Sequence, residues 1–568
     1  MNSQAPARIA AEDYLDALAA HGIDHLFVNP GTDFAPIIEA FSRAGRSNRK
    51  VPRPMVVPHE HAAVAMAHGY TLITGRPQAV MLHVNVGLAN AINALIDASR
   101  DRVPLLLTSG RTPLTEAGRH GARSVYIHWA QEMFDQAGML REFVKWDYEL
   151  RRGDQVDEVV DRAMELAQTS PGGPVYLALP REVLGEEMVP REVPPRLPRA
   201  RPEPPRAAGS DVERAAEWIA AARNPLVIAG QLGRDPREAL LLTRLAERFA
   251  LPVVPFNPRH FAISGNHPMF QGGAPGPLLA EADLVLVLES DVPWIPSVAS
   301  PGPAARIIQV GEDPLYQRYP MRSFRSDLTI TSNALAFLQA LEPALAQRTE
   351  PGMAGIAARR DRLAARSASL RAGWAGEIER AAHAETINLA WLNHCLRGVI
   401  AADTLVVNEY SFRQEYCPLD RPGSLFGLGP AGGLGWGLPA ALGIKLAAPE
   451  KQVVALLGDG AYMFANPTAC HLIADSQKLP ILAVIYNNAQ YGAVRRATLD
   501  MYATGVAAEA GGRLLADLPS PAFERIVEAH GGHGERVEHP AALPAALERA
   551  AAAVRGGQQA LVNVICRG

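Results

Sequence analysis

Residues 453–460 read Val-Val-Ala-Leu-Leu-Gly-Asp-Gly, and residues 482–488 read Leu-Ala-Val-Ile-Tyr-Asn-Asn. Each stretch is an apolar run of strand length that ends in polar turn residues. The chain between them is long enough for a crossover helix, which predicts two neighbouring parallel strands. Because open α/β sheets bind ligands at the carboxyl ends of their strands, we expect Asp459 and Asn488 to lie side by side at such an edge.

These two side chains offer oxygen atoms of the kind that hard cations prefer. Carboxylate and amide oxygens are suitable ligands for Mg²⁺, and a glycine turn at a helix N-terminus suits a phosphate group. Asp-Gly and Asn-Asn are also common loop dipeptides, so either one alone would usually be a simple turn. Their combination on two neighbouring strands favours a magnesium ion that bridges a diphosphate.

The pattern Gly-Asp-Gly followed by Asn-Asn resembles the cofactor motif of thiamine diphosphate (ThDP) enzymes. The resemblance implies three magnesium ligands: Asp459, the side chain of Asn488 and the backbone carbonyl of Gln490. The cofactor-binding residues that it implies in the same motif are Gly458, Gly460 and Ala461, the last two through backbone N–H groups that face the diphosphate.

The composition is that of a globular protein with several domains. A chain of 568 residues is too long for one core, and two to four domains are expected. Lys and Arg number 55 against 59 Asp and Glu, a net charge of −4 that gives no argument for a nucleic-acid partner. No apolar run resembles a signal peptide or a membrane span, and four cysteines without paired spacing argue against zinc. We therefore predict a cytoplasmic protein with no membrane partner.

Apolar runs alternate with helical stretches along the chain, which predicts α/β domains with doubly wound parallel sheets. We expect an N-terminal domain at 1–185, a Pro/Arg-rich linker at 186–208, a central α/β domain at 209–345, a helical linker at 346–382 and a C-terminal domain at 383–568. This layout resembles the pyruvate-oxidase-like ThDP enzymes over essentially the whole chain. The resemblance implies that the first domain binds the cofactor's pyrimidine and the last its diphosphate.

A carboxylate beside the aminopyrimidine ring is the second requirement of ThDP chemistry. Residues 55–70 read Met-Val-Val-Pro-His-Glu-His-Ala-Ala-Val-Ala-Met-Ala-His-Gly-Tyr, an apolar run followed by a helix of small residues. Glu60 alone could simply complement the dipole of that helix. The stretch resembles the family's cofactor-activating glutamate, which faces a cofactor held by the partner subunit. The resemblance therefore implies a homodimer or homotetramer with active sites at the subunit interface.

Residues 429–439 read Gly-Pro-Ala-Gly-Gly-Leu-Gly-Trp-Gly-Leu-Pro. So many glycines indicate a close approach of the backbone to a ligand, although a plain glycine-rich loop would explain them as well. By resemblance, Leu434 supports the cofactor's two rings and the carbonyl of Gly432 accepts a hydrogen bond from its amino group. The same resemblance places Tyr410 and Ser411, which follow another apolar run, near the diphosphate.

Two branches of the family compete for the substrate assignment. Thr32 in Asn-Pro-Gly-Thr and His83 in Leu-His resemble benzoylformate decarboxylase, where such residues handle the substrate carboxylate and protons. A structural histidine is the ordinary alternative for His83. That branch's second pocket histidine has no counterpart in residues 290–296, Ser-Asp-Val-Pro-Trp-Ile-Pro, and Ala497 replaces an aromatic residue of aryl-specific relatives.

The other branch is acetolactate synthase. Its sequences are similar to this chain at residues 290–296 and 129–132. The tryptophan that this branch carries near Ala497 is missing, and residues 210–345 show no convincing flavin signature, so FAD is not expected. Arg111 either binds an anionic substrate or is a surface arginine.

We therefore expect a benzoylformate-decarboxylase-like, ThDP- and Mg²⁺-dependent lyase that decarboxylates a 2-oxo acid to an aldehyde, with carboligation as a second possible outcome. The expected catalytic residues are Glu60, His83 and Thr32. The alternatives are an acetolactate-synthase-like carboligase, a 2-hydroxyacyl thioester lyase and a catalytically silent partner protein of the same fold. A silent protein would be free to lose Glu60, Asp459 and Asn488.

Overall fold

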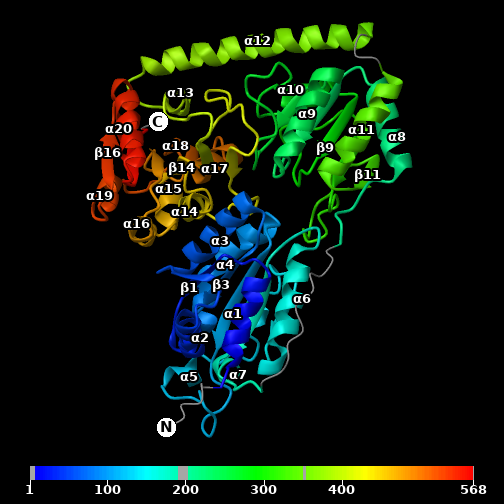
Figure 1. Ribbon diagram of the computed structural model, residues 1–568. Helices are drawn as coiled ribbons and strands as arrows, with labels where there is room; N and C mark the ends of the chain where they lie inside the picture. The colour runs from blue at the N-terminus through cyan, green and yellow to red at the C-terminus, as the bar shows by residue number, and fades with distance from the viewer. Residues whose placement is uncertain (1–6, 190–201, 350–352, 567–568) are drawn as a thin grey trace. The chain divides into compact units, whose positions relative to one another are not determined.

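The computed structural model describes residues 7–189, 202–349 and 353–566. These residues form three parallel α/β sheets, which Figure 1 shows from blue to cyan, in green, and from yellow to red. The inner strands of these sheets are almost entirely buried and rich in Val, Leu, Ile and Ala, as expected for parallel sheets with helices on both faces, whereas four of the strands at the edges are partly exposed. The predicted fold class is therefore confirmed.

The N-terminal sheet has six strands in the order β2-β1-β3-β4-β6-β5. Its strands are β1 His25–Asn29, β2 Arg53–Val56, β3 Gln78–Leu82, β4 Leu105–Arg111, β5 Asp147–Glu149 and β6 Val175–Pro180. Its helices are α1 Ala10–Ala20, η1 Thr32–Phe34, α2 Ala35–Arg46, α3 Glu60–Thr74, α4 Val84–Arg100, α5 Ile127–Ala130, η2 Ala137–Met139, η3 Gly153–Gln155, α6 Val156–Gln168 and α7 Arg181–Leu184. The strand order reverses between β1 and β3, and open α/β sheets bind their ligands at the carboxyl ends of the strands at such a point.

The middle sheet has five strands in the order β11-β10-β9-β7-β8. Its strands are β7 Pro225–Ala229, β8 Val253–Pro255, β9 Leu284–Leu288, β10 Arg306–Gly311 and β11 Leu328–Thr331. The helices are α8 Gly209–Ala221, α9 Pro236–Phe249, α10 Gly276–Glu281 and α11 Ala334–Arg348, followed by the 29-residue α12 Ala354–Ala382, which Figure 1 shows as one long helix. The predicted helical linker contains α12. Residues 190–201 of the predicted Pro/Arg-rich linker lie outside the described residues, and the domain boundaries stay predictions.

The C-terminal sheet has six strands in the order β13-β12-β14-β15-β17-β16. Its strands are β12 Leu405–Glu409, β13 Leu425–Gly427, β14 Val453–Gly458, β15 Leu482–Asn487, β16 His533–Val537 and β17 Ala560–Ile565. Its helices are α13 Leu389–Leu396, α14 Gly437–Ala447, α15 Asp459–Phe464, α16 Pro467–Ser476, α17 Gly492–Met501, α18 Val506–Glu509, α19 Phe523–Glu528, η4 Pro540–Ala542 and α20 Leu543–Arg555. β14 and β15 pair in parallel with Gly458 opposite Tyr486, as predicted for these two runs.

The chain divides into two compact units, which are described separately. The first combines the N-terminal part up to Pro202 with Gly429–Glu450 and Ala461–Leu479, and the second contains the remainder. Within the described residues, no helix is both long and apolar enough to cross a membrane.

In the first unit α3 and α14 pack backbone against backbone. A Cβ atom at Gly69 would lie 2.2 Å from the carbonyl oxygen of Ala440, and one at Gly443 would lie 2.0 Å from that of Met66. Only glycine allows this approach at either position. The small residues of α3 at this contact are therefore required by packing, and the contact fixes the middle of α3 against the middle of α14.

Candidate active site

Asp459 follows the carboxyl end of β14 directly and is the first residue of α15. It is 4% exposed, and its Oδ1 accepts a hydrogen bond from the backbone N–H of Gly460 at 2.8 Å. Its Oδ2 is buried and has no hydrogen-bond partner. Burial raises the pKa of Asp459, while the backbone N–H groups of Gly460, Ala489 and Gln490 oppose that shift. A cation at Oδ2 would offset the cost of burying this carboxylate.

The two asparagines at the end of β15 have different roles. Asn487 is 1% exposed, and its Nδ2 donates to Asn563 Oδ1 at 2.9 Å and to Ser520 Oγ at 2.8 Å, so it is a structural residue. Asn488 is only partly buried, and its Oδ1 accepts from the backbone N–H of Gln490 at 3.2 Å. Asn488 is therefore the asparagine whose side chain remains available for a ligand.

The donor set around Asp459 fits magnesium. It comprises one carboxylate, the Asn488 amide oxygen and the carbonyl oxygen of Gln490, which accepts from the N–H of Gly492 at 3.0 Å. No cluster of three His, Cys, Asp or Glu side chains that could hold a metal occurs in the described parts of the chain. A hard cation with few protein ligands, completed by phosphate oxygens, suits such a set.

The neighbouring cofactor-binding candidates lie at the same edge of the C-terminal sheet. β12 pairs with β14, and Tyr410 and Ser411 follow β12 directly. Tyr410 is 56% exposed with a positive φ of 78°, whereas Ser411 is buried. A Cβ atom at Gly458 would meet no atom within 4 Å, so there is open space beside the end of β14.

A second group of predicted residues lies in the first unit, along one face of α4. Asn90 Nδ2 donates to the Glu60 carboxylate at 2.7 Å, and Asn93 Nδ2 donates to the carbonyl of Leu434 at 3.0 Å. One turn further along α4, Asp97 Oδ1 accepts from the N–H of Gly433 at 3.0 Å. The structure thus brings the predicted carboxylate and the glycine-rich loop to the same helix face.

Backbone conformation explains the glycines of that loop. Gly432 and Gly435 have φ values of +67° and +96°, in the left-handed region that other residues rarely adopt. His61 Nε2, one residue after Glu60, donates to the carbonyl of Gly435 at 2.9 Å. Ala461 is buried in the same unit, in the middle of α15.

Thr32 and His83 lie at the reversal point of the N-terminal sheet. Thr32 follows β1, and His83 stands between β3 and α4. Each has a polar partner that the sequence analysis did not identify: His83 Nδ1 lies 2.6 Å from Asp33 Oδ1, and Thr32 Oγ1 lies 3.3 Å from His128 Nε2. Asp33 could have been suspected because it follows Thr32 directly, but nothing in the sequence points to His128.

Arg111 is occupied by internal contacts. Its guanidinium donates to Glu149 at 2.8 Å, to Glu132 at 3.2 Å and to the carbonyl of Met133 at 3.1 Å. Two carboxylates therefore balance its charge, which favours a structural role over binding of an anionic substrate.

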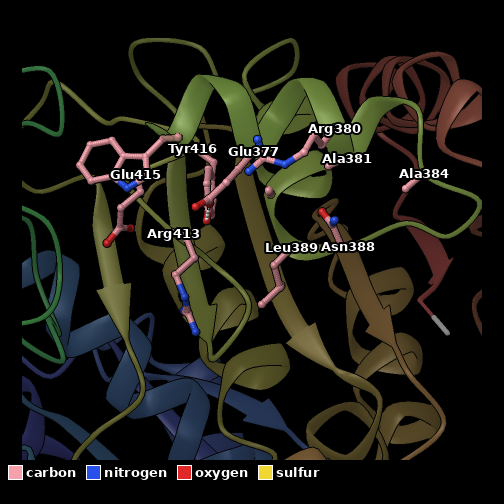
Figure 2. Close-up of a pocket in the computed structure, with 11 residues that line it drawn as sticks. Glu377, Arg380, Ala381, Ala384, Asn388, Leu389, Arg413, Glu415 and Tyr416 are labelled. Atoms are coloured by element: carbon pink, nitrogen blue, oxygen red, sulfur yellow. Dashed lines mark hydrogen bonds between the residues drawn. The ribbon is translucent and has the colours of Figure 1, made fainter. Parts of the chain in front are cut away.

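A pocket of about 700 Å³ lies at the C-terminal end of α12 and the start of α13. Figure 2 shows its lining residues, which are Trp374, Glu377, Arg380, Ala381, Ala384, Asn388, Leu389, Ala390, Arg413, Glu415 and Tyr416. Its charged side chains have both signs, and none of the predicted site residues lines it. The pocket is therefore distinct from the candidate site.

Family models match three parts of the chain. Residues 9–139 match the N-terminal TPP binding domain of thiamine pyrophosphate enzymes, residues 212–341 their central domain, and residues 409–564 their C-terminal TPP binding domain. The chain belongs to the thiamine pyrophosphate (ThDP) enzyme family.

Individual relatives are distant but match over most of their length. The acetolactate synthase isozyme 3 large subunit of Escherichia coli K12 is 26% identical, over 98% of this chain and 95% of that protein. The benzoylformate decarboxylase of Pseudomonas aeruginosa is 28% identical, over 84% of this chain and 86% of that protein. The structure of Rhodococcus jostii RHA1 4-hydroxybenzoylformate decarboxylase superposes with a TM-score of 0.76, at 23% identity and 99% coverage of both chains. This last likeness supports the fold alone.

Proposed function

We propose that this protein is a ThDP- and Mg²⁺-dependent carbon–carbon lyase that decarboxylates a 2-oxo acid to an aldehyde, with carboligation as a second outcome. The observation that carries the proposal is the buried Asp459, whose Oδ2 has no hydrogen-bond partner and which follows β14, the strand paired with the β15 that precedes Asn488. Glu60, Thr32 and His83 supply the other chemical groups that such a reaction requires.

Asp459, Asn488 and the carbonyl of Gln490 would hold the magnesium ion, and the cofactor-binding residues would be Gly458, Gly460, Ala461, Tyr410, Ser411, Gly432 and Leu434. Bound ThDP supplies an electron sink for the pair of electrons left when carbon dioxide departs. The protein's own part is to bind, orient and protonate.

Glu60 would face the pyrimidine of bound ThDP and would hold or release a proton at its carboxylate, which Asn90 keeps in position. The Thr32 hydroxyl binds the carboxylate of the 2-oxo acid. His83 exchanges a proton with the substrate's carbonyl oxygen.

Glu60→Gln tests this assignment. The parent should take up ThDP only with Mg²⁺ and convert 2-oxo acids, while the variant should bind the cofactor and turn over at least about 100-fold more slowly. Glu158→Gln is a matched control, because Glu158 is likewise an acidic residue in a first helical turn, that of α6. Undiminished turnover by Glu60→Gln would refute the role of Glu60, and a parent that binds no ThDP would refute the whole proposal.

The match to acetolactate synthase over 98% of the chain supports carboligation as the principal reaction instead. Adding an acceptor aldehyde or a second 2-oxo acid to the assay distinguishes the two. A 2-hydroxyacyl thioester lyase would cleave only thioester substrates. A silent partner protein would turn over none of them, and its retention of Glu60, Asp459 and Asn488 would be unexplained.

Two further parts of the proposal concern assembly and location. Active sites at the interface of a homodimer or homotetramer are expected from the family resemblance, and sedimentation of the purified protein measures the subunit number. A cytoplasmic location is supported by cysteines that are buried and unpaired, namely Cys395, Cys417, Cys470 and Cys566.

A further inference from the structure

Asp33 packs its carboxylate between the backbone of β4 at Gly110 and the imidazole of His83. It is 2% exposed, and a Cβ atom at Gly110 would lie 1.8 Å from its Oδ2. A Cβ atom at Gly31 would lie 2.0 Å from His83 Nδ1. The glycines at both positions therefore make room for the carboxylate and the ring.

The contact between Asp33 and His83 decides which ring nitrogen carries the proton. A carboxylate only accepts hydrogen bonds, so Asp33 Oδ1 at 2.6 Å keeps a hydrogen on His83 Nδ1. Neutral imidazole has one hydrogen, so Nε2 is left as an acceptor. The Val84 N–H donates to the other oxygen of Asp33 at 3.4 Å and orients the carboxylate.

His128 is arranged with the opposite tautomer. It is 3% exposed, and its Nδ1 accepts from the backbone N–H of Ser124 at 3.2 Å. Burial, with the charges of Arg181 and Arg123, lowers the pKa of His128, so the ring is neutral near pH 7. Because a backbone N–H can only donate, the ring hydrogen lies on Nε2, which faces Thr32 Oγ1 at 3.3 Å.

The Thr32 hydroxyl therefore accepts from His128 and keeps its own hydrogen for another partner. Thr32 is exposed, so that hydrogen is accessible to a ligand. Arg181 holds the segments of Thr32 and Ser124 together, because its guanidinium donates to the carbonyl groups of Thr32, Gly121 and Ala122 and to the Ser124 hydroxyl. The site thus presents one hydroxyl donor and one imidazole acceptor.

We propose that Asp33 and His128 are positioning residues of this site: Asp33 holds the His83 hydrogen on Nδ1, and His128 holds the Thr32 hydroxyl as a donor to the carboxylate of a 2-oxo acid. His128 thus adds a second histidine to the site of the N-terminal domain that holds Thr32 and His83. The inference rests on the proposed function for the identity of the substrate, but the hydrogen positions do not depend on it.

Nitrogen-15 NMR of histidine-labelled parent protein, without cofactor, tests the hydrogen positions directly. We expect His83 to carry its hydrogen on Nδ1 and His128 on Nε2, with each signal assigned by its loss in His83→Asn or His128→Gln. A hydrogen on His83 Nε2 or on His128 Nδ1 would overturn the proposal. This result stands even if the parent converts no 2-oxo acid, an outcome that would refute the proposed function instead.

Kinetics of Asp33→Asn test the coupling to His83. Since the Val84 N–H favours the carbonyl oxygen of the new amide, its NH₂ group faces His83 and moves the ring hydrogen to Nε2. We expect kcat to fall about 100-fold or more, with no further loss when Asp33→Asn is added to His83→Asn. Asp161→Asn, which makes the same change in the 2.7 Å contact between Asp161 and His21, is the matched control. Additive losses, or full activity in Asp33→Asn, would overturn the proposal.

The role of His128 is tested by a pair of variants. His128→Gln keeps a donor toward Thr32 and an acceptor for Ser124, whereas His128→Phe keeps the bulk and loses both. We expect KM for the 2-oxo acid to rise about tenfold in His128→Phe and to stay near the parent value in His128→Gln. Equal effects of the two variants on KM would contradict a role of His128 in orienting the hydroxyl.

Discussion

Gly443→Ala should loosen the contact between α3 and α14. A Cβ atom at this position would lie 2.0 Å from the carbonyl oxygen of Met66, whereas ordinary contacts begin at 3.4 Å. The two helices must then separate by about 1.4 Å, the difference between these distances. An overpacking cost of about 3 kcal/mol, less a gain of about 1 kcal/mol from replacing glycine within a helix, leaves a loss of about 2 kcal/mol.

The separation should also weaken cofactor binding, since α3 carries Glu60 and α14 follows the loop with Gly432 and Leu434. Urea unfolding followed by circular dichroism measures stability, and titration with ThDP and Mg²⁺ measures binding. Gly45→Ala is the matched control: Gly45 lies within α2, and a Cβ atom there meets nothing within 4 Å. Its free energy of unfolding should rise by up to about 1 kcal/mol. Equal stability of Gly443→Ala and the parent would refute the close packing.

Three other variants separate binding from structure. Burial raises the pKa of Asp459, so ionisation of this carboxyl lowers the stability of the folded protein as pH rises through the folded pKa. At pH 7, Asp459→Asn should therefore raise the unfolding free energy of the cofactor-free protein by about 1 kcal/mol and abolish Mg²⁺-dependent ThDP uptake. A less stable variant that still binds ThDP would contradict this prediction. Asn487→Ala should lower the free energy of unfolding by about 1–3 kcal/mol, whereas Asn488→Ala should chiefly weaken Mg²⁺ binding, as measured by calorimetry. The reverse pattern would show that Asn488 is the structural residue and Asn487 the ligand. Arg111→Met should lower the melting temperature without changing KM for the 2-oxo acid, and a selective rise in KM would show that Arg111 binds substrate.

The sequence predicted those parts of the site that depend on local pattern and simple topology. β14 and β15 are recognisable as apolar runs, and the rules for parallel strands place Asp459 and Asn488 at one sheet edge without further information. The start of α3 at Glu60 follows similarly from a strand, a proline and a run of small helix-forming residues.

Other parts depended on contacts between residues far apart in the sequence. The hydrogen bond from His128 to Thr32 spans 96 positions, and nothing local in the sequence shows that the small residues of α3 pack against α14. The separate roles of Asn487 and Asn488 became clear only from the position of Asn563 on β17. For Arg111, two acidic partners on separate segments decide between alternatives that the local sequence could not distinguish.

The most direct test of the proposed chemistry is product analysis with purified protein, ThDP and Mg²⁺. Mass spectrometry should detect aldehyde and carbon dioxide in equal amounts from at least one member of a panel of aliphatic and aryl 2-oxo acids. Formation of both should require ThDP and be lost in Glu60→Gln. Absence of carbon dioxide release from every 2-oxo acid, by a parent that has bound ThDP, would contradict the account.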